Sequence, residues 1–148
     1  MGNAMIMGQS AGGIEQVFSK PPTLISCSPH YMEVWNNIIP GKQLFCSSQN
    51  ICAALYSQLL SEKTSILFSI NFMLNGSNAD PDNGIICIVP YSTGGTKRAT
   101  VKDTLNRSWE VYAYASPTPN QIYVWLTNQS SDTIAYMGNA TITVLNYS

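Results

Sequence analysis

The sequence predicts an all-β fold, a two-sheet antiparallel β-sandwich or jelly roll, and three observations support this prediction. Short runs rich in β-branched and aromatic residues recur along the chain, and clusters of Gly, Pro, Asn and Ser separate them. Several runs alternate between apolar and polar residues, as strands do when a sheet buries one of its faces. The length of 148 residues fits one domain that is large enough to bury a core.

The N-terminal segment differs from the rest of the chain. Residues 1–20 carry four glycines without a sustained apolar period, so we expect a flexible arm or linker there. The sequence Lys20-Pro21-Pro22 marks its end, because a proline restricts the preceding residue to extended conformations. Residues 21–148 are therefore predicted to form a single β-sandwich domain.

Strands are expected in the runs between the turn signals. In chain order these runs are TLISCS, YMEVWNNII, QLFCSS, ILFSINFML, GIICIVPY, RATVK, SWEVYAYAS, QIYVWLTN, TIAYM and ATITVLNY. The turn signals include Pro40-Gly41-Lys42, the cluster NGSNADPDNG at 75–84, and STGG at 92–95. Many short strands with frequent turns are typical of sandwiches and jelly rolls.

Two local patterns in the last third of the chain add detail to these expected strands. In SWEVYAYAS, Trp109 and Val111 share one face and Tyr112 and Tyr114 the other, which predicts a half-buried strand. Gly138-Asn139 separates the last two runs, and such a pair is typical of a hairpin turn, so we expect a hairpin there.

One segment favours a helix. Residues 49–62 contain good helix formers, with Ile51, Leu55 and Leu59 at helical spacing and Ser48 as a cap. We expect a short helix near residues 49–62 that covers one end of the sheets.

Charge excludes several classes of function. Charged residues make up only 10% of the chain, against roughly 25% in an average soluble domain. The net charge of −1 leaves no basic excess for phosphates, so we expect no nucleic-acid partner. We expect no membrane insertion, because no apolar run reaches the roughly 18 residues of a membrane helix. Residues 120–148 hold a single charged residue, Asp132, which predicts that other copies cover the surface in a homo-oligomer.

Cysteine and histidine usage argues against a metal or catalytic centre. Cys27, Cys46, Cys52 and Cys87 form no CxxC pair and lie among apolar residues, which favours reduced structural thiols, with one disulfide as the alternative. His30 is the only histidine, and no GxSxG sequence surrounds the neighbouring serines. We therefore expect no catalytic residues and no cofactor.

Ligand-binding candidates come from a basic loop and from aromatic residues. Lys97 and Arg98 follow Gly94-Gly95 and stand out in a chain with few cations; the alternative is a solvated hairpin. Tyr114 and Tyr136 belong to a group of aromatic residues in the last third, where Tyr and Trp are typical of sugar-binding and interface surfaces; the alternative is core.

A calcium site is a further candidate. Asn78, Asp80 and Asp82 alternate along NADPDNG as oxygen ligands do in calcium loops. Val89 stands where an EF-hand loop would place a bidentate glutamate, so the alternative is an exposed hairpin loop without a metal.

The last third of the chain resembles the trimeric jelly-roll heads of virus and phage fibres, and the tumour-necrosis-factor-like and complement-type heads. The resemblance rests on NQIYVWLTN, the polar loop QSSDT, and IAYMGNATITVLNYS running to the end of the sequence. It covers residues 108–148 and implies a homotrimer that attaches to a cell-surface receptor.

These observations lead to one expected function and two alternatives. We expect a non-catalytic, particle-associated binding module, a virus or phage fibre or tail head that attaches to a cell-surface receptor such as a glycan. Without a signal peptide, it would be synthesised in the cytoplasm and carried on the surface of a virion or other extracellular particle. A structural capsid or decoration jelly-roll protein is the first alternative, and a small hydrolase is the second.

Overall fold

The computed structural model describes residues 23–27, 29–31, 35–51, 56, 63–74, 76–116 and 120–147, with the side chains of 29–31 and Ser116 excepted. The predicted arm at 1–20 lies outside this range. So does most of the helix predicted near 49–62, of which the description covers residues 49–51, which are not helical, and Tyr56, which is helical and buried.

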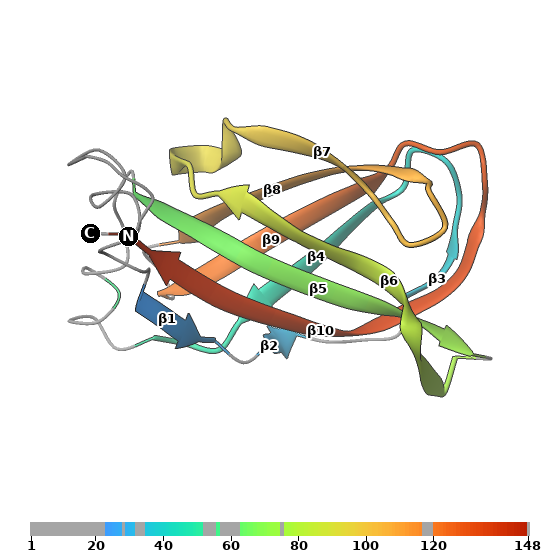
Figure 1. The fold of residues 1–148 in the computed structure, drawn as a ribbon, viewed down its shortest axis with the longest axis horizontal. Helices are drawn as coiled ribbons and strands as arrows, with labels where there is room; N and C mark the ends of the chain where they lie inside the picture. The colour runs from blue at the N-terminus through green and yellow to red at the C-terminus, as the bar shows by residue number, and fades with distance from the viewer. Residues whose placement is uncertain are drawn as a thin grey trace, which may run out of the picture.

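The described residues form ten strands and one 3-10 turn (Figure 1). The elements are β1 Thr23–Ser26, β2 Pro29–Tyr31, β3 Trp35–Ile38, β4 Gln43–Ser48, β5 Thr64–Leu74, β6 Asn78–Pro90, η1 Thr93–Gly95, β7 Arg98–Lys102, β8 Ser108–Ser116, β9 Gln121–Asn128 and β10 Ile134–Asn146. None of the described helical residues belongs to a segment long and apolar enough to cross a membrane.

Two antiparallel sheets pack face to face, which confirms the predicted β-sandwich (Figure 1). Sheet A has the order β1-β10-β5-β6, and β3 also pairs with β10. Sheet B has the order β2-β4-β9-β8-β7. The first strands therefore pair with the last ones, since β1 and β3 lie beside β10 and β4 lies beside β9. Each sheet packs one face against the other sheet and turns its second face away from it.

The core lies between the two sheets and follows the predicted alternation. In β5, Ile66, Phe68 and Ile70 point inward and are almost completely buried, while the residues between them are half-buried. On sheet B, Trp109 and Val111 of β8 are fully buried, as their position in the alternation predicts. The period of two thus places one apolar row of each sheet in the core.

The hairpin predicted at Gly138-Asn139 is wrong. Both residues lie inside the single strand β10, which pairs with β5 at Met137 and Gly138 and again from Thr141 onward. The register shifts between Gly138 and Thr141, so a β-bulge forms at Asn139 and Ala140, with Asn139 at φ 62°. Pairing with one long neighbouring strand outweighs the local turn preference, because a bulge retains the ladder on both sides.

The turn cluster at 75–84 is also shorter than predicted. Strand β6 begins at Asn78, and only Gly76 and Ser77 among the described residues of this stretch form the turn after β5. A register shift between Asn71 and Met73 accommodates the polar residues at the start of β6.

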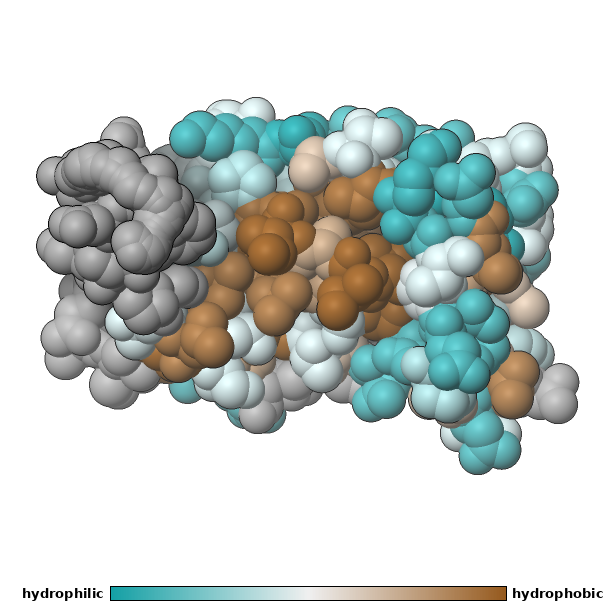
Figure 2. Space-filling view, in the orientation of Figure 1, coloured by the Kyte–Doolittle hydropathy of each residue, from teal (hydrophilic) through white to brown (hydrophobic). Residues whose placement is uncertain are grey.

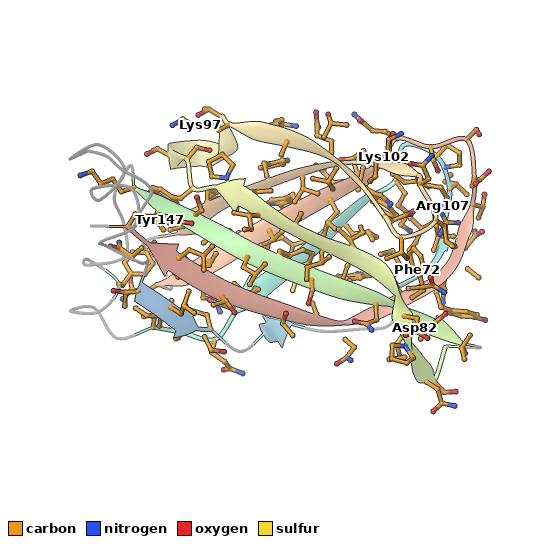
Figure 3. All side chains as sticks on the ribbon, viewed as in Figure 1. Phe72, Asp82, Lys97, Lys102, Arg107 and Tyr147 are labelled. Atoms are coloured by element: carbon orange, nitrogen blue, oxygen red, sulfur yellow. The ribbon has the colours of Figure 1, made fainter. Side chains whose placement is uncertain are left out.

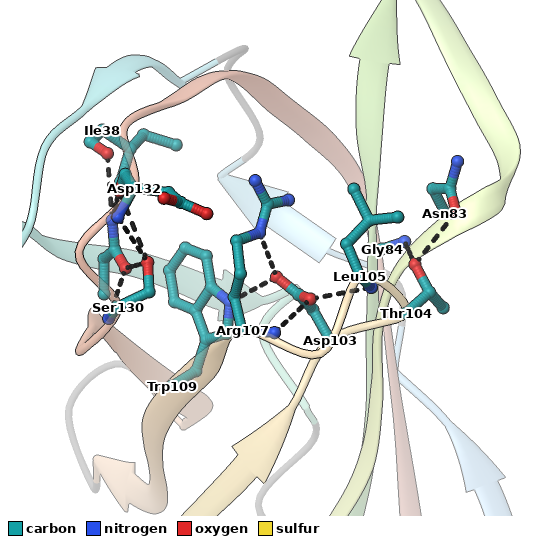
Figure 4. A network of polar contacts seen from close by, with 11 residues as sticks. Ile38, Asn83, Gly84, Asp103, Thr104, Leu105, Arg107, Trp109, Ser130 and Asp132 are labelled. Carbon is teal, nitrogen blue, oxygen red and sulfur yellow. Dashed lines mark hydrogen bonds and ion pairs between the residues drawn. The ribbon is translucent and has the colours of Figure 1, made fainter.

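A buried carboxylate holds the loop between β7 and β8 (Figure 4). Asp103 accepts hydrogen bonds from the backbone N–H groups of Leu105 and Arg107, both at 2.9 Å, on Oδ1. Its Oδ2 accepts from Nε of Arg107 and Nε1 of Trp109, both at 3.0 Å. Burial alone would raise the pKa of Asp103, but the hydrogen bonds from Trp109 and Arg107 and the Arg107 charge leave the pKa below its ordinary value.

A buried amide performs a similar role at the neighbouring loop (Figure 4). Asn128, at the end of β9, donates from Nδ2 to the carbonyl oxygens of Ile38 at 3.1 Å and Asp132 at 2.9 Å. Its Oδ1 accepts from the Ser130 N–H at 3.0 Å. The bond to Ile38 links the end of β9 in sheet B to β3 in sheet A, so the two sheets are joined by a hydrogen bond at this end of the sandwich.

Candidate functional site

Five aromatic side chains from three neighbouring strands gather on the outer face of sheet B, and we call them the aromatic face. They are Phe45 of β4, Tyr112 and Tyr114 of β8, and Tyr123 and Trp125 of β9. Each lies at an alternate position to a core residue, so the same period of two that buries the inner row turns these rings outward. The register places Trp125 between Phe45 and Tyr112, and Tyr123 beside Tyr114.

The rings contact one another across the strands. Trp125 lies 4.7 Å from Phe45 and 6.4 Å from Tyr112, centroid to centroid, and the Tyr112 and Trp125 planes differ by only 12°. Tyr114 is also within 12° of the Tyr112 plane, at 6.4 Å. Tyr123 meets Phe45 and Tyr114 edge to face, at 5.0 Å and 5.4 Å. Three nearly parallel rings therefore form the centre of the aromatic face.

Hydrogen bonds fix the polar ends of these rings. Gln43 donates from Nε2 to the Tyr112 hydroxyl at 3.2 Å, and the indole N–H of Trp125 donates to the Tyr114 hydroxyl at 3.3 Å. The second bond joins the adjacent strands β9 and β8, whereas the first spans β9 to join β4 with β8. They restrict the rotamers of the rings, so the surface is held in one arrangement before any ligand arrives.

Arg98 of β7 extends the central row by one strand. It pairs with Tyr112 in the register, and its guanidinium carbon lies 4.1 Å from the centroid of that ring. The same guanidinium forms an ion pair with Glu110 at 3.0 Å, yet 47% of the Arg98 side chain stays exposed. A cation is thus positioned at the margin of the aromatic face with access to solvent.

Lys97 lies just beyond this margin. Its backbone N–H donates to the Ser92 hydroxyl at 3.0 Å, which closes the η1 turn, while its side chain is exposed. Figure 3 labels Lys97 and Lys102 at opposite ends of β7. Gly95 of η1 lies directly against the Tyr112 ring, since a Cβ atom there would come within 2.5 Å of it. The basic loop predicted from sequence therefore borders the aromatic face.

Tyr136 belongs to a different surface. It lies on β10 of sheet A, opposite Asn36 of β3, and borders an open pocket of about 460 Å³ with Asn36, Asn37, Thr133 and Ala135. The structure therefore brings Arg98 and Tyr114 together on the aromatic face, with Lys97 at its edge, and separates Tyr136 from them.

The proposed calcium ligands lie at the start of β6, where Asp80 is engaged within its own turn. Its Oδ1 accepts from the Asp82 N–H at 3.1 Å and its Oδ2 accepts from Nδ2 of Asn83 at 2.8 Å. Among the residues that the structure describes, no three His, Cys, Asp or Glu side chains lie close enough together to hold a metal ion. Asp80 thus acts as a local turn cap in these strands.

His30, the candidate base of a hydrolase, lies in the short strand β2, and its side chain is outside the described atoms.

Three of the four cysteines lie among the described residues. Cys27, Cys46 and Cys87 are buried thiols, and desolvation raises the pKa of Cys46 to about 12 and that of Cys87 to about 11. They pack in the core; Cys52 lies outside the described residues.

Sequence reasoning left two parts of this surface unassigned. Gln43 and Phe45 come from the run QLFCSS. Its alternation could have indicated their outward positions, because Leu44 and Cys46 between and after them are buried. Trp125 belongs to the aromatic group of the last third, for which core packing is the alternative; it lies outward and half-buried, whereas Trp109 is fully buried.

Comparisons with protein-family models, curated proteins and solved structures find no match to this chain.

Proposed function

We propose that this chain is a non-catalytic binding module of a virus, phage or similar extracellular particle, and that its aromatic face binds a carbohydrate of a cell-surface receptor. One observation carries this proposal. Five rings from three adjacent strands form one surface, the polar ends of Tyr112, Tyr114 and Trp125 are already hydrogen-bonded, and a half-exposed arginine lies at the margin.

The chemistry of the surface suits a sugar. The C–H faces of a pyranose ring are apolar and stack on Tyr and Trp rings, whereas the hydroxyl groups need neutral hydrogen-bonding partners. Gln43 and Thr127 form the next row beside Trp125 and Tyr112 and supply such partners. Arg98 provides a charge-assisted hydrogen bond for the carboxylate of an acidic sugar.

Other ligand classes fit this surface less well. Single-stranded nucleic acids also stack on aromatic side chains, but they require a positively charged groove along the backbone. The chain has a net charge of −1, and Glu110 offsets the cation nearest to the rings, Arg98. A carbohydrate, neutral or acidic, therefore agrees best with both the rings and the charge.

Self-association completes the proposed function. One small stacking site binds a sugar weakly, and several sites on one particle bind a cell surface much more tightly by avidity. We propose a homo-oligomer, with a trimer as the state implied by the resemblance of residues 108–148 to fibre heads. Surface display on the particle follows from this role.

A glycan array tests the ligand. Wild-type protein should bind a defined set of glycans, and Tyr123→Ala and Trp125→Ala should each weaken binding about two- to tenfold, since stacking on one ring contributes about 0.5–1.5 kcal/mol. Tyr147→Ala is the matched control, because Tyr147 is an exposed aromatic residue outside the aromatic face. Binding that both ring variants leave unchanged would refute the proposal.

A structural capsid or decoration protein is the second candidate. The outer face of sheet A favours it, because this face is uncharged and apolar, as an assembly contact would be. Light scattering separates the two functions. A closed small oligomer that binds glycans supports the receptor role, whereas large shells without glycan binding support the structural one.

A further inference from the structure

The outer face of sheet A is the second distinctive surface of the molecule, and it crosses β1, β10, β5 and β6. In the register, Leu24 pairs with Leu145, and Leu67 pairs with Ile88. Hydroxyl residues occupy most of the other outward positions, namely Ser26, Ser65, Ser69, Thr141 and Thr143. Figure 2 shows brown apolar residues gathered in the middle of this face, with teal residues along the top and at the right-hand end. We call this surface the uncharged face.

The apolar side chains of the uncharged face are unusually exposed. Ile86, Ile88 and Leu24 expose 69%, 57% and 65% of their surface, and Pro90 is also exposed. Two of these are alternate residues of one strand, β6, which is at the edge of its sheet. Contiguous exposed apolar residues on an edge strand are typical of surfaces that another protein covers.

Charge decides what kind of partner fits. The strands β1, β5 and β10, and the part of β6 from Ile85 to Pro90, contain no Asp, Glu, Lys or Arg. In a contact between identical copies, a charged residue near the symmetry axis faces its own like charge. A face without charges avoids this repulsion, so it is complementary to itself. A charged partner, by contrast, would find a group of opposite sign only at one end of the face, where Asp82 lines the same pocket as Ser69 and Ile86.

The polar groups in the middle of the face do not oppose burial. The Ser69 and Thr141 hydroxyls hydrogen-bond each other at 2.6 Å across β5 and β10. Burying a hydroxyl group is costly chiefly when it loses its hydrogen-bond partner, and these two hydroxyls remain bonded to each other when they are buried. The face can therefore leave water without leaving these two groups unsatisfied.

We propose that a second copy of this chain covers the uncharged face, with the side chains of Ile86 and Ile88 at the contact. The proposed function includes a homo-oligomer, and this inference names the surface through which its copies contact one another. It rests on the homo-oligomer alone. The ligand plays no part in it, because the aromatic face lies on the opposite sheet.

Measurement of the mass in solution tests this contact. Wild-type protein should form an oligomer in size-exclusion chromatography with light scattering at micromolar concentration. The double variant Ile86→Lys with Ile88→Lys should weaken self-association by about a hundredfold or more, because two buried apolar side chains are lost and four charges face one another. Leu105→Lys is the matched control, since Leu105 is 54% exposed but lies in the β7–β8 loop.

A milder pair of substitutions guards against misfolding. Ile86→Thr with Ile88→Thr keeps β-branched residues that favour strands while it removes apolar surface. This variant should melt within a few degrees of wild type and still self-associate more weakly. Circular dichroism melts of all variants provide the folding control.

Two results would overturn the proposal. Wild-type protein that stays monomeric at about 100 μM is the first, and an oligomer that all four substitutions leave intact is the second. If wild-type protein is monomeric and deletion of residues 1–13 converts it into an oligomer, the chain's own N-terminal segment, and not a second copy, covers the face. Glycan binding is read separately, so a failed ligand and a failed contact remain distinguishable.

Discussion

The guanidinium of Arg98 lies over the ring of Tyr112 at 4.1 Å and also forms an ion pair with Glu110 at 3.0 Å. Arg98 can make both contacts because Glu110 and Tyr112 are two residues apart on β8 and point to the same face, opposite Arg98 on β7. The cation is therefore held in place at the edge of the aromatic face. A positioned charge loses less entropy when it binds an anion than a freely moving one does.

The first prediction concerns the basic margin. Lys97→Ala with Arg98→Ala should preserve the fold and the oligomer, but weaken binding of an acidic glycan or of receptor-bearing cells about ten- to a hundredfold, and more at low salt. Calorimetry or surface binding at two salt concentrations measures this. Arg98→Lys is the control for charge. Equal affinity of the double variant and wild type would leave the rings alone as the binding surface.

The second prediction uses two adjacent glycines with similar backbone angles, at φ 68° and φ 70°. Gly94→Ala should cost about 1–2 kcal/mol, the penalty of a left-handed residue, because nothing lies within 4 Å of its Cβ position. Gly95→Ala should cost more and should also weaken glycan binding, since its Cβ would push the Tyr112 ring aside. Urea unfolding and glycan affinity of both variants test this; equal effects would show that η1 does not support the ring.

The third prediction concerns the buried carboxylate. Asp103→Asn should lower the free energy of unfolding by about 3 kcal/mol at pH 7, because it weakens the hydrogen bonds from Trp109 and Arg107 and leaves the Arg107 charge without a counter-ion. Urea unfolding measures the loss. Asp132→Asn is the control, because Asp132 is exposed, and its own substitution should change stability by less than about 0.5 kcal/mol.

The pH dependence of Asp103 follows from its lowered pKa. A carboxylate whose folded pKa lies below the unfolded value adds stability above the unfolded pKa, near 3.8, and loses it as the pH falls through the folded value. The difference in stability between wild type and Asp103→Asn should thus be constant from pH 5 to 7 and should shrink below about pH 4. A difference that stays unchanged at pH 3 would contradict this assignment.

The fourth prediction concerns the thiols. Burial raises the pKa of Cys27, Cys46 and Cys87, so these groups stay protonated and unreactive at pH 8. Native protein should therefore show at most one rapidly reacting thiol with a disulfide reagent, namely Cys52, and unfolded protein should show all four thiols. Two or more fast thiols in the native state would argue against the described core.

The amino-acid sequence by itself determined the all-β sandwich and most of its strands. Alternation in SWEVYAYAS separates Trp109, in the core between the sheets, from Tyr112 on the outer face of sheet B, where Arg98 and Gly95 lie against its ring and leave it 9% exposed. Such patterns are readable because each residue of a half-buried strand is chosen by the face to which it points. The burial of Cys27, Cys46 and Cys87 was predictable for a similar reason, since their neighbours in sequence are apolar.

Only the tertiary structure decided where the chain turns and which side chains meet. Gly138-Asn139 has the composition of a hairpin, but β10 pairs with β5 up to Gly138 and again from Thr141, so the chain continues through a bulge within β10. Phe45, Tyr112 and Trp125 become neighbours because the registers of β4, β9 and β8 bring them into one row. Register between strands that are distant in sequence depends on the fit of the whole core, and no local pattern encodes it.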